Sequence, residues 1–178
     1  DQIDDHRARL MANVEQAMAL AESESANKNK SSLFDMLEAV DVPQVAIIEV
    51  PRWDERVKLT EEKNAVGFYI SGHPFDAHAK GIRQFIKSSL ERLEPSRTPQ
   101  MIAGIVSGLR IKNGDRGRMA FVTLDDGKAR RDVTVYSEVF EANRNKIKED
   151  TLLVIEGKVS EDRFSGGLRI IADTIYDI

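Results

Sequence analysis

Residues 99–178 alternate between short apolar runs and turn residues, which restricts this part of the chain to a small β-sheet domain. Five runs have the length and alternation of strands: 101–111, 118–124, 130–136, 151–159 and 168–176. Asp126-Gly127 and Gly166-Gly167 lie between such runs and indicate hairpins, because these turns need positive φ at their centre. One helix is expected between the third and fourth strands, over residues 137–147.

Three strands, a helix and two more strands, in that order, are typical of the OB-fold, a small Greek-key barrel that commonly binds oligonucleotides. Upstream, helical spacing of apolar residues predicts helices over 5–24, 54–66 and 76–93. In the second of these, Leu59 belongs to the expected buried stripe and Glu62 to the polar side. The predicted fold class is therefore α+β: a helical N-terminal and linker region followed by a five-stranded OB-fold β-barrel.

Composition limits the possible functions. The 178-residue chain is 41% hydrophobic and has no cysteine, which excludes disulfides and thiolate metal sites. No apolar run approaches the roughly 20 residues of a membrane helix and no signal-peptide pattern is present, so we expect a cytoplasmic protein without membrane contact. Asp125-Asp126 is explained as turn chemistry, and no catalytic constellation is found. The start at Asp1 and the end at the last strand indicate a fragment of a larger protein.

Charge does not by itself identify a nucleic-acid-binding domain. The net charge is −4, and residues 99–178 hold 13 basic and 13 acidic residues. The better signal is the clustering of four cations around one loop: Arg110, Lys112, Arg116 and Arg118. Clustered cations rather than net charge mark such a surface.

Alternation along the strands predicts which aromatic side chains project from the sheet. If Val122 and Leu124 face the core, Phe121 and Tyr136 point outward, where stacking bases and phosphate-binding cations suit single-stranded nucleic acid. The opposite assignment would make Phe121 a core residue. The loops after the first strand and before the last usually hold the ligand of an OB-fold. The predicted nucleic-acid-binding residues are Arg110, Lys112, Arg116, Arg118, Phe121, Arg130, Tyr136, Arg163, Phe164 and Arg169.

The sequence next resembles a known family. The run from Glu61 to Pro74, with its Gly-His-Pro ending, is similar to a segment of the bacterial DNA polymerase III alpha subunit, of the C family of polymerases. The stretches 123–126 and 164–169 resemble that family's OB domain, and His6-Arg7-Ala8 resembles the region after its tandem helix-hairpin-helix motifs. The resemblance covers essentially the whole chain, and the ending favours replicative over error-prone members.

The resemblance implies a DNA-directed DNA polymerase, a nucleotidyltransferase active in DNA replication, whose catalytic regions lie outside this fragment. The fragment itself is expected to carry no catalytic residues and no cofactor, with magnesium expected for the full-length polymerase. The implied partners are the sliding clamp (beta), single-stranded template DNA and, through other regions, the proofreading exonuclease and the clamp-loader tau subunit. The implied division is a helix continuing from a helix-hairpin-helix region (1–26), a flexible linker with a clamp-binding motif (27–50), a helical bridging segment (51–98) and the OB-fold domain (99–178).

The polar stretch that ends at Leu33-Phe34 is interpreted as a short linear motif. Spacing alone favours the alternative, the start of a locally packed helix capped by Ser31 or Ser32. The family's clamp motif has a pattern like Gln-x-x-Leu/Met-Phe, which implies clamp binding through Leu33 and Phe34. Lys30 stands where glutamine is expected, and it brings a charge to a subsite that a neutral amide normally fills.

Two other functions stay open. Strands such as 121–125 also resemble the anticodon-binding module of class II aminoacyl-tRNA synthetases. Alternatively, the barrel is a scaffold that docks protein and makes no contact with nucleic acid.

Overall fold

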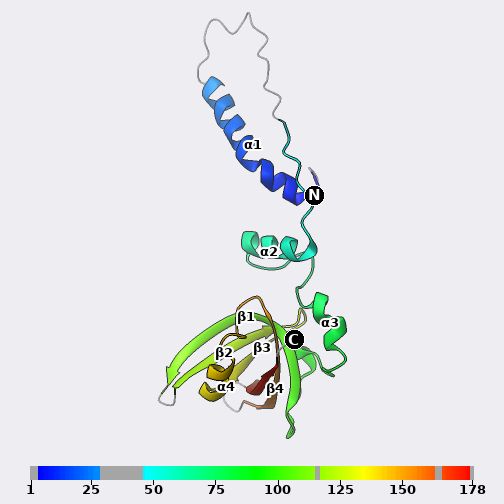
Figure 1. Cartoon of the computed structure of the whole chain (residues 1–178), viewed down its shortest axis with the longest axis vertical. Coiled ribbons are helices and arrows are strands. Elements are labelled where there is room, and N and C mark those ends of the chain that lie inside the picture. Colours follow the sequence, from blue (N-terminus) through cyan, green and yellow to red (C-terminus); the bar gives the residue numbers. More distant parts are fainter. Residues whose placement is uncertain (1–3, 29–45, 115–116, 163–165, 177–178) are drawn as a thin grey trace, which may run out of the picture. The chain divides into compact units, whose positions relative to one another are not determined.

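The computed structural model describes residues 4–28, 46–114, 117–162 and 166–176 (Figure 1). The chain divides into two compact units, Asp1–Glu61 and Glu62–Ile178. The first unit contains α1 (Arg7–Lys28) and the beginning of α2 (Glu55–Val66). The predicted boundaries after residues 26, 50 and 98 remain predictions.

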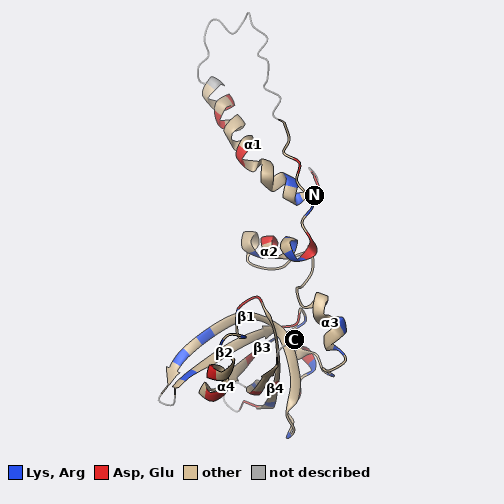
Figure 2. Ribbon diagram, in the orientation of Figure 1, with Lys and Arg blue, Asp and Glu red and all other residues tan. Residues whose placement is uncertain are grey.

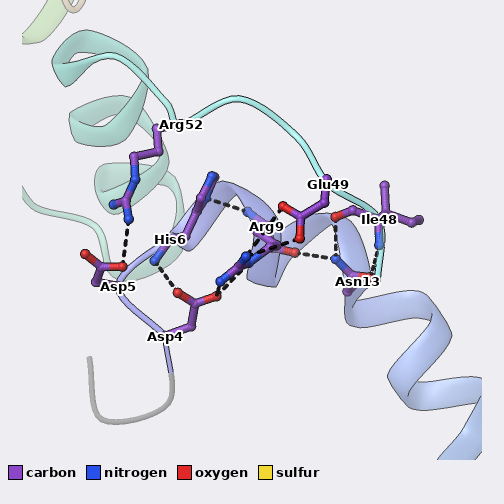
Figure 3. A network of polar contacts seen from close by, with 8 residues as sticks. All are labelled: Asp4, Asp5, His6, Arg9, Asn13, Ile48, Glu49 and Arg52. Carbon is purple, nitrogen blue, oxygen red and sulfur yellow. Dashed lines mark hydrogen bonds and ion pairs between the residues drawn. The ribbon is translucent and has the colours of Figure 1, made fainter. Parts of the chain in front are cut away.

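In the first unit, the segment that precedes α2 lies along the start of α1 (Figure 3). The Asn13 amide donates to the carbonyl of Ile48 (3.0 Å) and accepts from its N–H (2.8 Å), so one side chain satisfies both polar groups of that residue. Arg9 donates to Asp4 at 2.7 Å and to Glu49 at 3.2 Å. These polar contacts fix the segment while Leu10, Met11, Val14 and Met18 of α1 remain 39–62% exposed.

The second unit contains the predicted five-stranded barrel. Its elements are α3 (Asp76–Ile82), the 3₁₀ turn η1 (Leu90–Arg92), β1 (Gln100–Gly114), β2 (Gly117–Asp125), β3 (Arg130–Val135), α4 (Ser137–Asn143), β4 (Leu152–Glu161) and β5 (Leu168–Tyr176). The strands close into a ring in the order β1-β2-β3-β5-β4, and only the β3–β5 pairing is parallel. This order, with a helix between β3 and β4, confirms the predicted OB-fold (Figure 1).

Alternating side chains fill the barrel. The buried core consists of Leu90, Leu93, Ile102, Val106, Ala120, Val122, Leu124, Val133, Val135, Phe140, Ile147, Leu153, Ile155, Val159, Ile170, Ala172 and Ile175. Val122 and Leu124 are fully buried, so the predicted assignment of the β2 faces is confirmed. At Gly157 the strands approach so closely that a Cβ would lie 2.5 Å from the carbonyl oxygen of Ile171.

The helix expected over 76–93 is wrong in its length, because α3 ends at Ile82. Ile82 packs with Ala103 and Val154 in a second apolar cluster, where those two residues are partners on β1 and β4. Leu90 instead belongs to the barrel core. Ile82 and Leu90 thus belong to two separate clusters, and one straight helix cannot place a residue in each. Tertiary packing overrides the helical pattern of the sequence here.

The segment Gly67–Pro74, here called the Gly-His-Pro segment, folds back on the end of α2. Glu62 is 7% exposed and accepts hydrogen bonds from the N–H groups of Ile70 (3.0 Å) and Ser71 (2.9 Å) and from Ser71 Oγ (2.6 Å). Placing Glu62 on the polar side was therefore wrong: its carboxylate is buried because it supplies acceptors to this loop. Gly67, at φ +85°, makes the turn out of the helix.

The same segment contacts the barrel at two points. The hydroxyl of Tyr69 donates to Asp150 at 3.2 Å, and Lys63 pairs with the same carboxylate. Burial of the phenol and the nearby Asp150 charge raise the pKa of Tyr69 to about 12. Nε2 of His73 lies 3.4 Å from the Asp125 carboxylate. The interpretation of this stretch as a packed turn is confirmed.

Candidate nucleic-acid interface

One side of the barrel wall is covered and another is open. The α3 region packs over β1 and β4 through the cluster that contains Ala103 and Val154. On β2 and β3, by contrast, the outward side chains include Phe121, which is half-buried, and Thr134, its Cα partner on β3. Tyr136, just beyond the end of β3, is 38% exposed. The candidate interface is therefore the outer surface of the β1–β2 hairpin and β3.

Two predicted cations and an aromatic ring meet on this surface. Nζ of Lys112 lies 5.4 Å from the centre of the Phe121 ring, and Arg110 is the Cα partner of Phe121 on the neighbouring strand. A cation over an exposed ring contributes about 0.5–1 kcal/mol, whereas a stacked base contributes about 1–3 kcal/mol. A base can therefore displace the lysine from the ring and leave it available for a phosphate.

Charge is concentrated along the hairpin. Figure 2 shows basic segments on β1 and β2 toward the loop that joins them, and acidic residues on the neighbouring α4. Within the part of the chain that the structure describes, neither Arg110 nor Lys112 forms an ion pair with a carboxylate. Of the predicted cations that the structure describes, these two are the most readily offered to an anionic ligand.

Other predicted cations are engaged inside the protein. Arg118 forms a two-point ion pair with Glu141 of α4, with N–O distances of 2.8 and 3.0 Å. Nε of Arg130 donates to Asp125 at 2.6 Å. Both guanidinium groups would have to exchange a carboxylate for a phosphate in order to bind nucleic acid.

Arg169 and Tyr136 form a third predicted pair. Nη2 of Arg169 donates to the hydroxyl of Tyr136 at 2.9 Å, although the two residues come from β5 and the end of β3. The contact holds the hydroxyl in place, while Tyr136 as a whole remains partly exposed. Asp132, also on β3, accepts from Thr123 at 2.6 Å and adds a negative charge to this side of the barrel.

Several predicted site residues lie outside the described residues: Arg116, Arg163, Phe164, Lys30, Ser31, Ser32, Leu33 and Phe34. Sequence reasoning missed Glu141, because it is separated by 23 residues from the arginine that it binds. It also missed Thr134, which only the strand register places opposite Phe121.

Over residues 4–28, 46–114, 117–162 and 166–176, no group of three or more His, Asp or Glu side chains is placed to hold a metal ion. Among these same residues, no helix is both long enough and apolar enough to cross a membrane.

Residues 101–178 match a family model of the tRNA anticodon type, described as an OB-fold nucleic acid binding domain. A solved structure, the second OB-fold domain of replication protein A from Methanococcus maripaludis, is 18% identical with a TM-score of 0.40 and covers 51% of this chain and 93% of its own. The closed strand order and the matched family define the barrel as an OB-fold domain of the nucleic-acid-binding type.

Similarity extends beyond the barrel. DNA polymerase III subunit alpha of Neisseria meningitidis serogroup B is 41% identical over all of this chain, and that of Pseudomonas aeruginosa is 34% identical over 99% of it. The resemblance to the bacterial DNA polymerase III alpha-subunit family is thus confirmed along the entire chain. The chain spans 16% and 15% of the length of these two relatives.

Proposed function

We propose that the chain acts as part of a replicative DNA polymerase alpha subunit, in which the barrel binds single-stranded template DNA. The observation that carries the proposal is the group formed by Arg110, Lys112 and Phe121 on the open side of an OB-fold. Bases stack on the ring, and the two cations follow the phosphates.

Fluorescence anisotropy of this chain on a labelled oligothymidylate tests the proposal. Phe121→Ala removes one stacking surface, worth about 1–3 kcal/mol, so affinity falls about 5- to 150-fold. Phe85→Ala is the matched control, since Phe85 is 71% exposed and comes from the segment after α3. Equal affinity of both variants and the parent chain would refute a stacking role for Phe121.

Salt dependence tests the cations separately. Each phosphate contact on single-stranded DNA contributes about 0.7 to the slope of log affinity against log salt. Lys112→Gln and Arg110→Gln should each reduce the slope by about that amount. A slope unchanged in the double variant would show that phosphates follow another path.

The tRNA-binding alternative has one supporting observation, the anticodon type of the matched family model. That match covers the barrel only, whereas the polymerase relatives cover the whole chain. A competition experiment with the labelled oligothymidylate separates the two functions. A template-binding barrel releases the labelled DNA more readily to unlabelled oligothymidylate than to unlabelled tRNA. No binding to either would favour the protein-docking scaffold.

We further propose that Leu33 and Phe34 tether the chain to the sliding clamp. Support comes from their fit to the clamp motif pattern in a chain that resembles the alpha subunit throughout its length. Leu33→Ala together with Phe34→Ala should abolish binding to an immobilised clamp, while Lys30→Gln restores the expected amide and strengthens it. Clamp affinity that is indifferent to the double change would exclude this motif.

The proposal extends to the whole subunit as a cytoplasmic, magnesium-dependent, DNA-directed DNA polymerase that assembles with the proofreading exonuclease and the clamp-loader tau subunit. Primer extension by the longer subunit carrying Phe121→Ala tests the contribution of the barrel. Extension on a long single-stranded template should shorten, whereas addition of a single nucleotide at a saturating primer concentration should not change.

A further inference from the structure

The ion pair between Arg118 and Glu141 lies at the end of the candidate interface. Arg118 is the second residue of β2, and Glu141 is on α4. Both guanidinium contacts are short, at 2.8 and 3.0 Å, and reach the two oxygens of one carboxylate. This fork-to-carboxylate arrangement occupies the same donors that would grip a phosphate.

The backbone around the pair fixes its geometry. A Cβ at Gly117 would lie 3.2 Å from Cβ of Ser137, so the beginning of β2 lies directly against the beginning of α4. The position of Glu141 one turn farther along α4 then brings its side chain back to Arg118. The pairing therefore follows from the docking of two elements of one unit.

A phosphate can take the place of Glu141 at Arg118 at little cost. The two side chains are 41% and 44% exposed, and water and salt screen an ion pair at such a position, so that it contributes little to stability. A phosphate that takes the place of Glu141 also releases a condensed counterion, which favours binding about fivefold per contact at roughly 0.1 M salt. The carboxylate and a nucleic-acid phosphate are therefore matched competitors for one arginine.

We propose that Glu141 masks Arg118 and thereby limits the affinity of the barrel for single-stranded nucleic acid. The inference rests on the proposed function and adds to it a residue that sets affinity from outside the contact surface. With Glu141 in place, phosphates bind through Arg110 and Lys112. With the carboxylate removed, Arg118 becomes a third cation on the same hairpin.

A double-mutant cycle on the full chain tests the mask, with anisotropy on a labelled oligothymidylate at several salt concentrations. Glu141→Gln should raise affinity about fivefold near 0.1 M salt and increase the salt slope by about 0.7. Arg118→Gln alone should change affinity less than twofold, and in its presence Glu141→Gln should have no effect. Glu138→Gln, on the exposed side of the same helix, is the control for removing a negative charge.

Each outcome decides a different point. A gain from Glu141→Gln that persists in the Arg118→Gln background, or that Glu138→Gln reproduces, would mean simple repulsion and would overturn the mask. A large loss from Arg118→Gln alone would overturn it too, because Arg118 would already be bound to phosphate. Binding by the parent chain with no effect of Glu141→Gln refutes only the mask. Absence of binding in all variants refutes the proposed function together with it.

Discussion

Replacing Asp126 should destabilise the second unit more than any other single carboxylate change on the β2–β3 turn. Asp126 is 7% exposed, and its two oxygens accept three backbone N–H groups. Oδ1 accepts from Lys128 (3.0 Å) and Ala129 (2.9 Å), which closes the turn, and Oδ2 accepts from Leu90 at 2.8 Å. The last bond ties the segment before the barrel to the barrel itself.

In Asp126→Ala, the loss of the three hydrogen bonds does not cost the same free energy at each of the three N–H groups. Water can replace the carboxylate at Lys128, which is exposed, and partly at Ala129. The N–H of Leu90 is buried, and leaving a buried donor unsatisfied costs about 1–3 kcal/mol, in addition to the loss of the charge-assisted turn bonds. We expect a total loss of about 3 kcal/mol, which corresponds to about 10 °C in Tm for a unit of this size.

Urea and thermal unfolding followed by circular dichroism measure the effect. Asp132→Ala is the matched control, since Asp132 is exposed and its carboxylate accepts a hydrogen bond from the Thr123 hydroxyl at the surface of the sheet. It should change stability by less than about 0.5 kcal/mol. Asp126→Asn should fall between the two, because one amide nitrogen then faces an N–H. A loss of unfolding free energy below about 1 kcal/mol for Asp126→Ala would refute the claim that this carboxylate ties the segment before the barrel to the barrel.

The Gly-His-Pro segment and the barrel wall each allow further tests. Glu62→Ala should raise amide hydrogen exchange at Ile70 and Ser71 at least about tenfold without affecting β2, and unchanged exchange would contradict its role as their acceptor. Gly157→Ala should cost more than about 2 kcal/mol in urea unfolding, because its Cβ meets a backbone oxygen at 2.5 Å, while Gly166→Ala, with no atom within 4 Å, tests strain from positive φ alone. Tyr69 should ionise near pH 12 in an absorbance titration, and Tyr69→Phe should remove that step. Since its folded pKa is raised above the ordinary value of 10.0, Tyr69 contributes stability that is present below pH 10 and lost between pH 10 and 12; a transition near pH 10 would contradict this.

Most of the barrel could be predicted because its signals are local. Alternation in β2 and β3 identifies Val122 and Val133 as core residues, and Asp126-Gly127 marks the hairpin between them. The same local logic failed at Glu62 and at residues 83–93. Glu62 is buried by donors eight and nine residues away, and Leu90 is drawn into the barrel by Asp126, so neither outcome is encoded in helical periodicity.

Local sequence signals also do not tell which cations of the candidate interface already have a carboxylate partner. Arg110, Lys112, Arg118 and Arg130 are equivalent in the sequence, since each is a cation near a strand end. The fold separates them: two have carboxylate partners, Glu141 and Asp125, and two lie beside Phe121 without one among the described residues. Counting basic residues therefore overstates the number of cations that are available to a phosphate on this surface. Because each contact adds its own increment to the salt slope, that slope measures how many cations are available and is a sharper test of this surface than affinity alone.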